Sequence, residues 1–217
     1  EIIIQCIDAN SRLKKPDLSI LNKISNKGIS TPITYVGGIN SIEDASEVIN
    51  LGTERICLDS SLHENISLVE KLSKKFGSQA LVLSLPLTIK KSSIFHYNYK
   101  KKINKKFDDR LIEYIDDKLI SELLIIDWMN EGYRNKFNFK LLDYIPFKKI
   151  PLILFGGITE TKQFKKAFLK DSVSAVATGN ILSYNEHNVQ KIKRSINLEN
   201  LRKPFFENQN LNFIINE

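Results

Sequence analysis

Two stretches of this chain, TPITYVGGINSIEDA at Thr31–Ala45 and IPLILFGGITETKQF at Ile150–Phe164, decide its fold. The proline, both glycines and the following isoleucine coincide at an offset of 119 residues, from residue 31 to residue 150. The match continues weakly into the next strand, RICLDSS against SAVATGN. Four strand–helix units of about 30 residues fill such an interval, which indicates two similar four-unit halves. Because an open doubly wound sheet has no reason to repeat in this way, the repeat predicts a (β/α)8 barrel.

Short β-branched runs alternate with amphipathic stretches along the chain. This alternation predicts a parallel sheet, because each parallel strand needs a crossover helix. The predicted strands are Ile2–Ile7, Pro32–Val36, Arg55–Leu58, Leu81–Leu85, Glu122–Ile126, Leu152–Phe155 and Ala175–Thr178. The predicted helices are Asp17–Lys27, Ile42–Leu51, Asn65–Phe76, Asp108–Lys118, Phe139–Tyr144, Thr161–Leu169 and Glu186–Ile196.

The repeat also counts the units of the barrel. If its first copy is the third unit and its second copy the seventh, one unit follows the second copy, as expected for eight. Only one unit, residues 1–28, precedes the first copy, where the symmetry requires two. The chain also begins at Glu1, and its single methionine is Met129. We therefore expect units two to eight in residues 1–196, a C-terminal tail in residues 197–217, and a first unit that is missing from this chain.

The composition, 42% apolar and 26% charged, is that of an ordinary globular domain. No run approaches the ~18 apolar residues of a membrane span, and no signal peptide is recognisable. Cys6 and Cys57 lie in apolar runs and are interpreted as buried free thiols in a reducing cytoplasm. The histidines show no metal-ligand spacing, so neither a metal nor another cofactor is expected.

The net charge of +7 raises the question of a nucleic-acid partner. Most of the excess is lysine spread along a chain rich in Ile and Asn, which is typical of a solvated surface. The segment Lys100–Lys106 is different, because Phe95, Tyr97 and Tyr99 precede it closely. Such interleaving occurs in nucleic-acid platforms and in small exposed hairpins at a barrel mouth, and the spacing favours the hairpin. We expect no nucleic-acid and no membrane partner.

Gly37–Gly38 and Gly156–Gly157 follow predicted strands, so they lie at the carboxyl end of the barrel, where active sites are built. Paired glycines let backbone N–H groups approach a phosphate, and the helix start behind them favours an anion. A single Gly-Gly pair after a strand is often only a tight turn. Two pairs at half-barrel spacing predict two phosphate cradles across one mouth, which suits a substrate with a phosphate at each end.

The chain resembles the cyclase subunit of imidazole glycerol phosphate synthase and its close barrel relatives, from Glu1 to about Ile196. The segments that carry the resemblance are PITYVGGINSIEDA, ERICLDSSLHEN, FGSQALVLSL, ELLIIDWMNEG, IPLILFGGITETKQFKKAF and SAVATGNIL. The resemblance implies a glutaminase subunit as partner, whose ammonia crosses the barrel to a phosphorylated substrate at the mouth. It also implies two catalytic aspartates, at the ends of the first and fifth strands.

Carried over position by position, the resemblance implies two phosphate sites. The first consists of Gly37, Gly38, Asp59 and Ser60. The second consists of Gly132, Gly156, Gly157, Gly179 and Asn180. Asp59 stands where the family usually has Asn, and a carboxylate there repels a phosphate unless a Lys or Arg intervenes.

The catalytic pair of the family is not preserved. The first aspartate would lie on the missing strand, and Pro86 occupies the second position, where it can neither give nor take a proton. Asp8 and Asp127, at the ends of the second and sixth barrel strands, are the remaining catalytic candidates. A structural role is the favoured interpretation of each.

At the opposite end of the barrel, Arg55 and Glu122 match the ring of charges that forms the ammonia gate in the family. The acidic member from the second strand falls on Ile3, or on Glu1 if the strand carries a bulge. An ion pair that merely closes the barrel floor is an equally good interpretation of these residues.

Three functions remain open. The chain is an ammonia-channelling barrel that pairs with a glutaminase and feeds sugar amidation for a surface polysaccharide, as in some relatives that also depart from the catalytic pattern. Alternatively it is a genuine cyclase of histidine biosynthesis, against which Pro86 argues, or a non-catalytic barrel that binds a phosphorylated ligand.

Overall fold

The computed structural model describes residues 1–7, 15–59, 65–107, 115, 119–147, 149–184, 186–196 and 201. The strands are β1 (Ile2–Gln5), β2 (Ile33–Val36), β3 (Arg55–Leu58), β4 (Leu81–Lys90), β5 (Ser93–Asn98), β6 (Ile103–Lys106), β7 (Glu122–Asp127), β8 (Leu152–Phe155) and β9 (Val173–Val176). The α-helices are α1 (Leu18–Ser25), α2 (Ile42–Asn50), α4 (Ser67–Phe76), α6 (Leu141–Tyr144), α7 (Thr161–Phe168) and α8 (Asn188–Ile196), with 3-10 turns η2 (Ser78–Ala80) and η3 (Asn180–Ser183).

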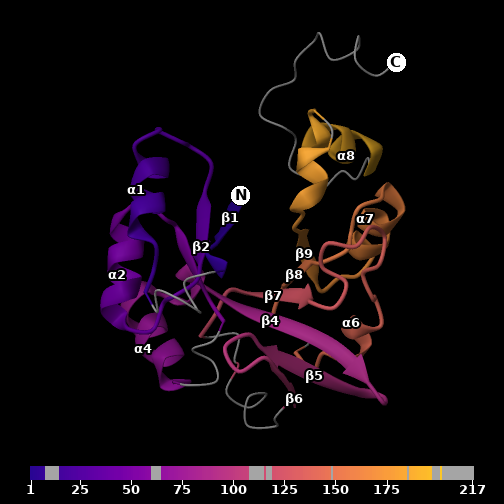
Figure 1. The fold of residues 1–217 in the computed structure, drawn as a ribbon, viewed down its shortest axis with the longest axis horizontal. Coiled ribbons are helices and arrows are strands. Elements are labelled where there is room, and N and C mark those ends of the chain that lie inside the picture. Colours follow the sequence, from indigo (N-terminus) through magenta and orange to yellow (C-terminus); the bar gives the residue numbers. More distant parts are fainter. Residues whose placement is uncertain are drawn as a thin grey trace.

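The sheet follows the order β1-β2-β3-β4-β7-β8-β9, and all of these neighbours are parallel. Figure 1 shows α1, α2 and α4 along one flank of this curled sheet and α6, α7 and α8 along the other. The alternation of strand and helix and the curled parallel sheet are those of a (β/α)8 barrel, as predicted. Within the described residues β1 and β9 do not pair, so the sheet is open between them.

The helices behind the two Gly-Gly turns begin with side-chain caps. Ser41 Oγ accepts a hydrogen bond of 3.0 Å from the N–H of Asp44 at the start of α2. At the start of α7, Glu160 and Gln163 form a reciprocal capping box. Caps of this kind satisfy backbone donors that a helix leaves unpaired in its first turn, and they fix the point where each turn becomes a helix.

Side chains of the barrel strands alternate between two cores, as the period of two of a strand requires. One set, including Tyr35, Ile56, Leu83 and Leu123, points outward and packs under the helices. The other set fills the interior of the barrel and consists of Val36, Cys57, Val82, Leu124, Ile126 and Ile153, with Ile3, Trp128, Phe155, Ala175 and Ala177 packed against it. The interior is therefore apolar and filled, as in other barrels of this type.

The chain differs from the sequence prediction at β4, which was expected to end at Leu85. It continues through the buried Pro86 to Lys90. Pro86 lies between Leu83, the last residue paired with β3, and Leu87, the first paired with β5. Proline has no N–H to donate to a neighbouring strand. It is tolerated at this point of β4 because the neighbour on one edge changes here from β3 to β5.

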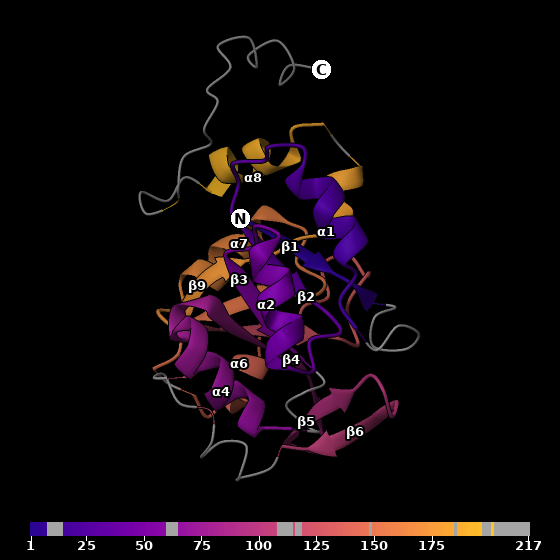
Figure 2. The same ribbon diagram turned by 90° about the vertical axis from the view of Figure 1, so that its left-hand side faces the viewer.

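The predicted hairpin is confirmed. β5 runs antiparallel to β4, β6 runs antiparallel to β5, and Lys100–Lys102 lie in the turn between β5 and β6. Figure 2 shows this hairpin projecting at the end of the molecule remote from α8. The hairpin is not simply exposed, however, because His96 and Asn98 are only 1% and 4% accessible. These two buried side chains alternate with Phe95 and Tyr97, which lie on the other, partly exposed face of β5.

Several predicted ends shift. β1 ends at Gln5 rather than Ile7, and β9 starts at Val173 rather than Ala175. Most of the predicted helix 108–118 lies outside the described residues. Both cysteines are free; Cys57 is buried, as predicted, whereas Cys6 is only half-buried. Among the described helices, none has the length and apolar character needed to cross a membrane.

Candidate functional site

A pocket of about 800 Å³ opens at the carboxyl ends of β7, β8 and β9. Its lining includes every residue predicted for the second phosphate site, namely Gly132, Gly156, Gly157, Gly179 and Asn180. Three separate βα connections supply these residues. The sequence prediction thus refers to residues that the fold brings together in one cavity.

The electrostatics of the pocket favour an anion. Arg134, Lys162 and Lys191 line it from the β7–α6 connection, from α7 and from α8. The acidic residues of the lining are Glu131 and Glu160. Burial raises the pKa of the Glu131 carboxyl, which favours its neutral form, and Glu160 is engaged in the capping box of α7.

Three residues of this lining also have backbone N–H groups without a hydrogen-bond partner in the described part of the chain. Among the described residues, no hydrogen bond uses the N–H of Gly157, Gly179 or Asn180. Backbone N–H groups left in this way are the usual ligands of phosphate oxygens in α/β proteins. Together with the three cations they make this cavity a candidate site for an anion.

The glycine pairs also have a packing role. A Cβ on Gly156 would lie 2.7 Å from the carbonyl oxygen of Asp127, and one on Gly157 would lie 2.9 Å from that of Asn130. Gly37 and Gly38 repeat this arrangement, with Cβ distances of 2.6 Å to Cys6 O and 2.4 Å to Lys15 O. In both halves of the barrel, therefore, each glycine permits close contact with the backbone of the preceding unit.

The predicted first phosphate site is different from the second. Gly37, Gly38 and Asp59 lie at the ends of the neighbouring strands β2 and β3, whereas Ser60 lies outside the described residues. None of them lines the pocket at β7–β9. Burial raises the pKa of the Asp59 carboxyl to about 7, although the Lys100 ammonium in the hairpin turn lowers it in part. A lysine thus does intervene beside this carboxylate.

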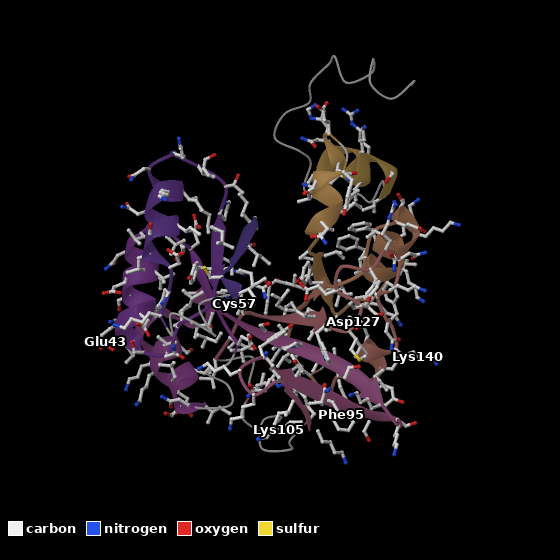
Figure 3. All side chains as sticks on the ribbon, in the orientation of Figure 1. Glu43, Cys57, Phe95, Lys105, Asp127 and Lys140 are labelled. Carbon is white, nitrogen blue, oxygen red and sulfur yellow. The ribbon has the colours of Figure 1, made fainter. Side chains whose placement is uncertain are left out.

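Asp127, a catalytic candidate, belongs to the strand positions that point outward with Leu123 and Ile125. Its Oδ2 accepts hydrogen bonds from Asn130 Nδ2 (2.8 Å) and from the N–H of Asn138 (2.7 Å). Burial raises the pKa of Asp127, and these hydrogen bonds lower it in part. Figure 3 shows Asp127 on the flank of α6, away from the central Cys57. These contacts favour the structural interpretation, in which Asp127 fixes the β7–α6 connection.

The other positions of the catalytic pattern add no acid to the mouth. Asp8 lies outside the described residues. Pro86 shares the strand parity of Val82, whose side chain fills the interior, so it occupies an inward position near the mouth. The side chain at this inward position carries no proton that chemistry could use.

The floor of the barrel carries a polar network. Arg55 forms an ion pair with Glu122, and its Nη1 lies 3.6 Å from Glu1 Oε1. The hydroxyl of Thr34 donates to Glu1 Oε1 (2.5 Å), and that of Ser174 donates to Glu122 Oε1 (2.6 Å). Of the two candidates for the acidic position, Glu1 is the one that reaches Arg55, although β1 pairs with β2 in regular register, without the bulge on which the prediction of Glu1 depended. Arg55 thus lies between two carboxylates, that of Glu1 just before β1 and that of Glu122 in β7.

The described residues hold no cluster of His, Cys, Asp and Glu suited to a metal ion. Sequence reasoning missed Arg134, Thr178, Lys162 and Lys191 in the pocket. Lys162 could have been found, because it stands in the first turn of the helix that follows Gly156–Gly157. Lys191 could not, because only the packing of α8 beside η3 brings it to the mouth; the Asn188 side-chain amide donates to the carbonyl of Ile181 there.

Comparison with known proteins agrees with this geometry. A model of the family described as "Histidine biosynthesis protein" matches residues 1–188 of the chain. Imidazole glycerol phosphate synthase subunit HisF of Dictyoglomus turgidum is 26% identical over 198 residues, covering 89% of this chain and 77% of that protein. The subunit HisF of Thermotoga sp. is 26% identical over 196 residues, 89% and 76% of the two chains. That of Campylobacter concisus is 27% identical over 177 residues, 81% and 70% of the two chains.

Proposed function

Since the chain belongs to the family of histidine biosynthesis proteins, we propose that it is a cyclase-type barrel subunit related to imidazole glycerol phosphate synthase. It binds a phosphorylated small molecule at its mouth and receives ammonia through its floor from a glutaminase partner in the cytoplasm. The observation that carries the proposal is the placement of a cation-lined pocket at the carboxyl ends of β7–β9 and of an ion-pair network at the opposite ends of the barrel strands, with β7 common to both.

The pocket supports the first half of the proposal. A phosphate at Gly157, Gly179 and Asn180 would meet unused backbone N–H groups, with the side chains of Lys162 and Lys191 in the same lining. Charge-assisted hydrogen bonds of this kind are the strong ones in phosphate recognition. The glycines of this turn also pack closely against backbone, at positions where a Cβ would clash.

The floor supports the second half. Arg55, Glu1 and Glu122 meet where the strands begin, and above them the interior is lined by apolar side chains such as Val82 and Leu124. An apolar interior admits neutral ammonia more readily than ammonium, because an unpaired charge is costly to bury. The network would have to rearrange for ammonia to enter, and a docked partner is a natural source of that rearrangement.

We further propose that the ammonia serves an acceptor other than the ring-closing reaction of histidine biosynthesis, namely the amidation of a sugar for a surface polysaccharide. Pro86 supports this proposal, because the inward position at the end of the fifth barrel strand offers no acid or base. Asp127, the nearest described alternative, is held by Asn130 and Asn138 in a loop.

The test uses the purified full chain with a glutaminase encoded beside its gene. We expect a stable complex in which glutamine hydrolysis rises at least tenfold over that of the glutaminase alone. Arg55→Gln should reduce this stimulation severalfold, whereas Arg194→Gln, at an exposed position of α8, should not. A failure to bind or to stimulate would overturn the channelling function and leave a phospho-ligand-binding barrel.

A second assay separates the two cyclase-related functions. The phosphoribosyl substrate of imidazole glycerol phosphate synthase is supplied with free ammonium at high pH, which bypasses the glutaminase. We expect no turnover. Measurable ring closure by the wild-type chain would instead identify a genuine cyclase of histidine biosynthesis.

A further inference from the structure

The cavity at β7–β9 is much larger than the group of backbone donors inside it. Its volume of about 800 Å³ falls within the range of about 300–1,000 Å³ in which pockets bury most of a small-molecule ligand. The N–H groups of Gly157, Gly179 and Asn180 belong to only two of its connections, those after β8 and β9. The greater part of the cavity is therefore available to the group that carries the phosphate.

One face of α8 forms a long wall of this cavity. Asn188, Lys191, Ile192 and Ser195 line it, and residues three, four and seven positions apart lie on the same side of a helix. At 1.5 Å of rise per residue this face is roughly 10 Å long, which exceeds the size of a phosphate group. The hydroxyl oxygens of Thr161, at the start of α7, and of Ser195 lie 3.0 Å apart, so the two helices meet along the wall. Figure 1 shows α8 next to α7, beyond the end of β9.

Neutral hydroxyl and amide side chains supply much of the remaining lining. They come from the connections after β8 and β9 and from α7 and α8, namely Thr159, Thr161, Thr178, Asn180, Asn188 and Ser195. Such side chains both donate and accept hydrogen bonds, which suits the hydroxyl groups of a sugar. The cations and the backbone N–H groups are thereby left for the phosphate.

Two exposed tyrosines also line the cavity. Tyr133, in the β7–α6 connection, is 64% exposed, and Tyr184, directly after η3, is 74% exposed. Among the described residues, neither ring pairs with another aromatic ring or with a cation. Tyr97, by contrast, is covered by Trp128. Single exposed hydrophobic residues are normal on a protein surface, but two free aromatic faces on one cavity indicate a binding surface.

We propose that this pocket takes a nucleoside phosphate, whose phosphate binds at the glycine turns and whose base stacks on Tyr133 and Tyr184. The proposal rests on the phosphate-binding function of the pocket and names the class of compound that it takes. A phosphate alone would leave both rings and the wall of α8 without a ligand. An aromatic side chain stacks on purines and pyrimidines alike, because every base has a π-face.

The test compares three anionic probes, sulfate, ribose 5-phosphate and AMP, by isothermal titration calorimetry at pH 8. AMP carries a base that ribose 5-phosphate lacks, so the ratio of their affinities measures the contribution of the base. We expect AMP to bind at least tenfold more tightly than ribose 5-phosphate. UMP should bind within about fivefold of AMP, and sulfate should displace AMP from the pocket.

Substitutions assign the base to the two rings. Tyr133→Ala and Tyr184→Ala should each weaken AMP binding about fivefold or more and leave the affinities for sulfate and ribose 5-phosphate within about twofold. Tyr184→Phe should bind AMP like the wild-type chain, because the ring face and not the hydroxyl carries the contact. The matched control is Tyr144→Ala, which removes a 37% exposed ring of α6 outside the lining and should change none of the affinities.

The outcomes separate this proposal from the one on which it rests. If the wild-type chain binds neither sulfate nor AMP, the phosphate pocket itself is refuted. If sulfate binds but AMP binds no more tightly than ribose 5-phosphate, the pocket stands and the nucleoside assignment is overturned in favour of a sugar phosphate. If both alanine variants keep the wild-type affinity for AMP, the assignment of the base to these tyrosines is overturned. Circular dichroism and urea unfolding verify that each variant is folded.

Discussion

At Asp59 the native chain holds a carboxylate where burial disfavours its charge. Burial raises its pKa from the ordinary 3.8 to about 7, and the nearby Lys100 ammonium offsets only part of that effect. Between these two pH values the native state binds a proton that the unfolded chain has already released. The free energy of unfolding contributed by this group therefore falls as the pH rises from about 4 to about 7, and the full penalty remains above pH 7.

Asp59→Asn should remove this penalty. We expect the variant to gain on the order of 1–2 kcal/mol in the free energy of unfolding at pH 8 and little or nothing at pH 4. Urea unfolding of both chains at the two pH values measures the difference. A gain of equal size at both pH values would contradict the raised pKa. Asp171→Asn, which removes a carboxylate from the exposed surface, should show no such pH dependence.

At the scale of the elements, the Gly-Gly turns and the hairpin differ in how far they could be predicted. The turns were predictable, because glycines behind a strand and in front of a capped helix allow few other conformations. The hairpin was predictable as an element from its lysines and aromatics. Its packing was not, because the predicted strand ended at Leu85, whereas β4 continues through Pro86 to Lys90 and pairs with β5 after it has left β3.

The packing of the hairpin on the mouth can be measured through Tyr97. Truncation by Tyr97→Ala removes the ring that stacks on Trp128 and contacts Tyr99 edge-on at 5.0 Å. We expect a loss of about 1–3 kcal/mol in the free energy of unfolding, from lost burial and lost ring pairing. Tyr133→Ala removes a ring that is 64% exposed and should cost less than about 0.5 kcal/mol. Equal losses in the two variants would contradict the packed hairpin.

At the scale of the whole molecule, the repeat predicted the barrel, because the barrel follows from strand order. The resemblance to the family, rather than the repeat, pointed to the glycines that line the pocket at β7–β9. The floor ring was only partly predictable. Glu1 and Arg55 meet because of the register in which β1, β2 and β3 pair. A single sequence indicates that a strand is present much better than it indicates the register of that strand.

The two ends of the barrel should act independently in solution. They are separated by strands of four to six residues, or roughly 13–20 Å, so substitutions at the two ends should be additive. We expect Arg55→Gln to lower glutaminase stimulation without changing sulfate affinity, and Lys162→Gln to lower sulfate affinity about fivefold or more without changing stimulation. The double variant should show the product of the two effects. A sulfate affinity that depends on residue 55 would instead reveal coupling through the interior.

Trp128 is the single tryptophan of the chain, and it stands where the hairpin meets the barrel. Its indole N–H is buried without a hydrogen-bond partner among the described residues, and its face is covered by Tyr97. The molecule therefore carries its own optical reporter: any event that lifts the hairpin exposes this indole to water and shifts its emission to longer wavelength. Opening of the mouth can be followed in real time on the unlabelled protein.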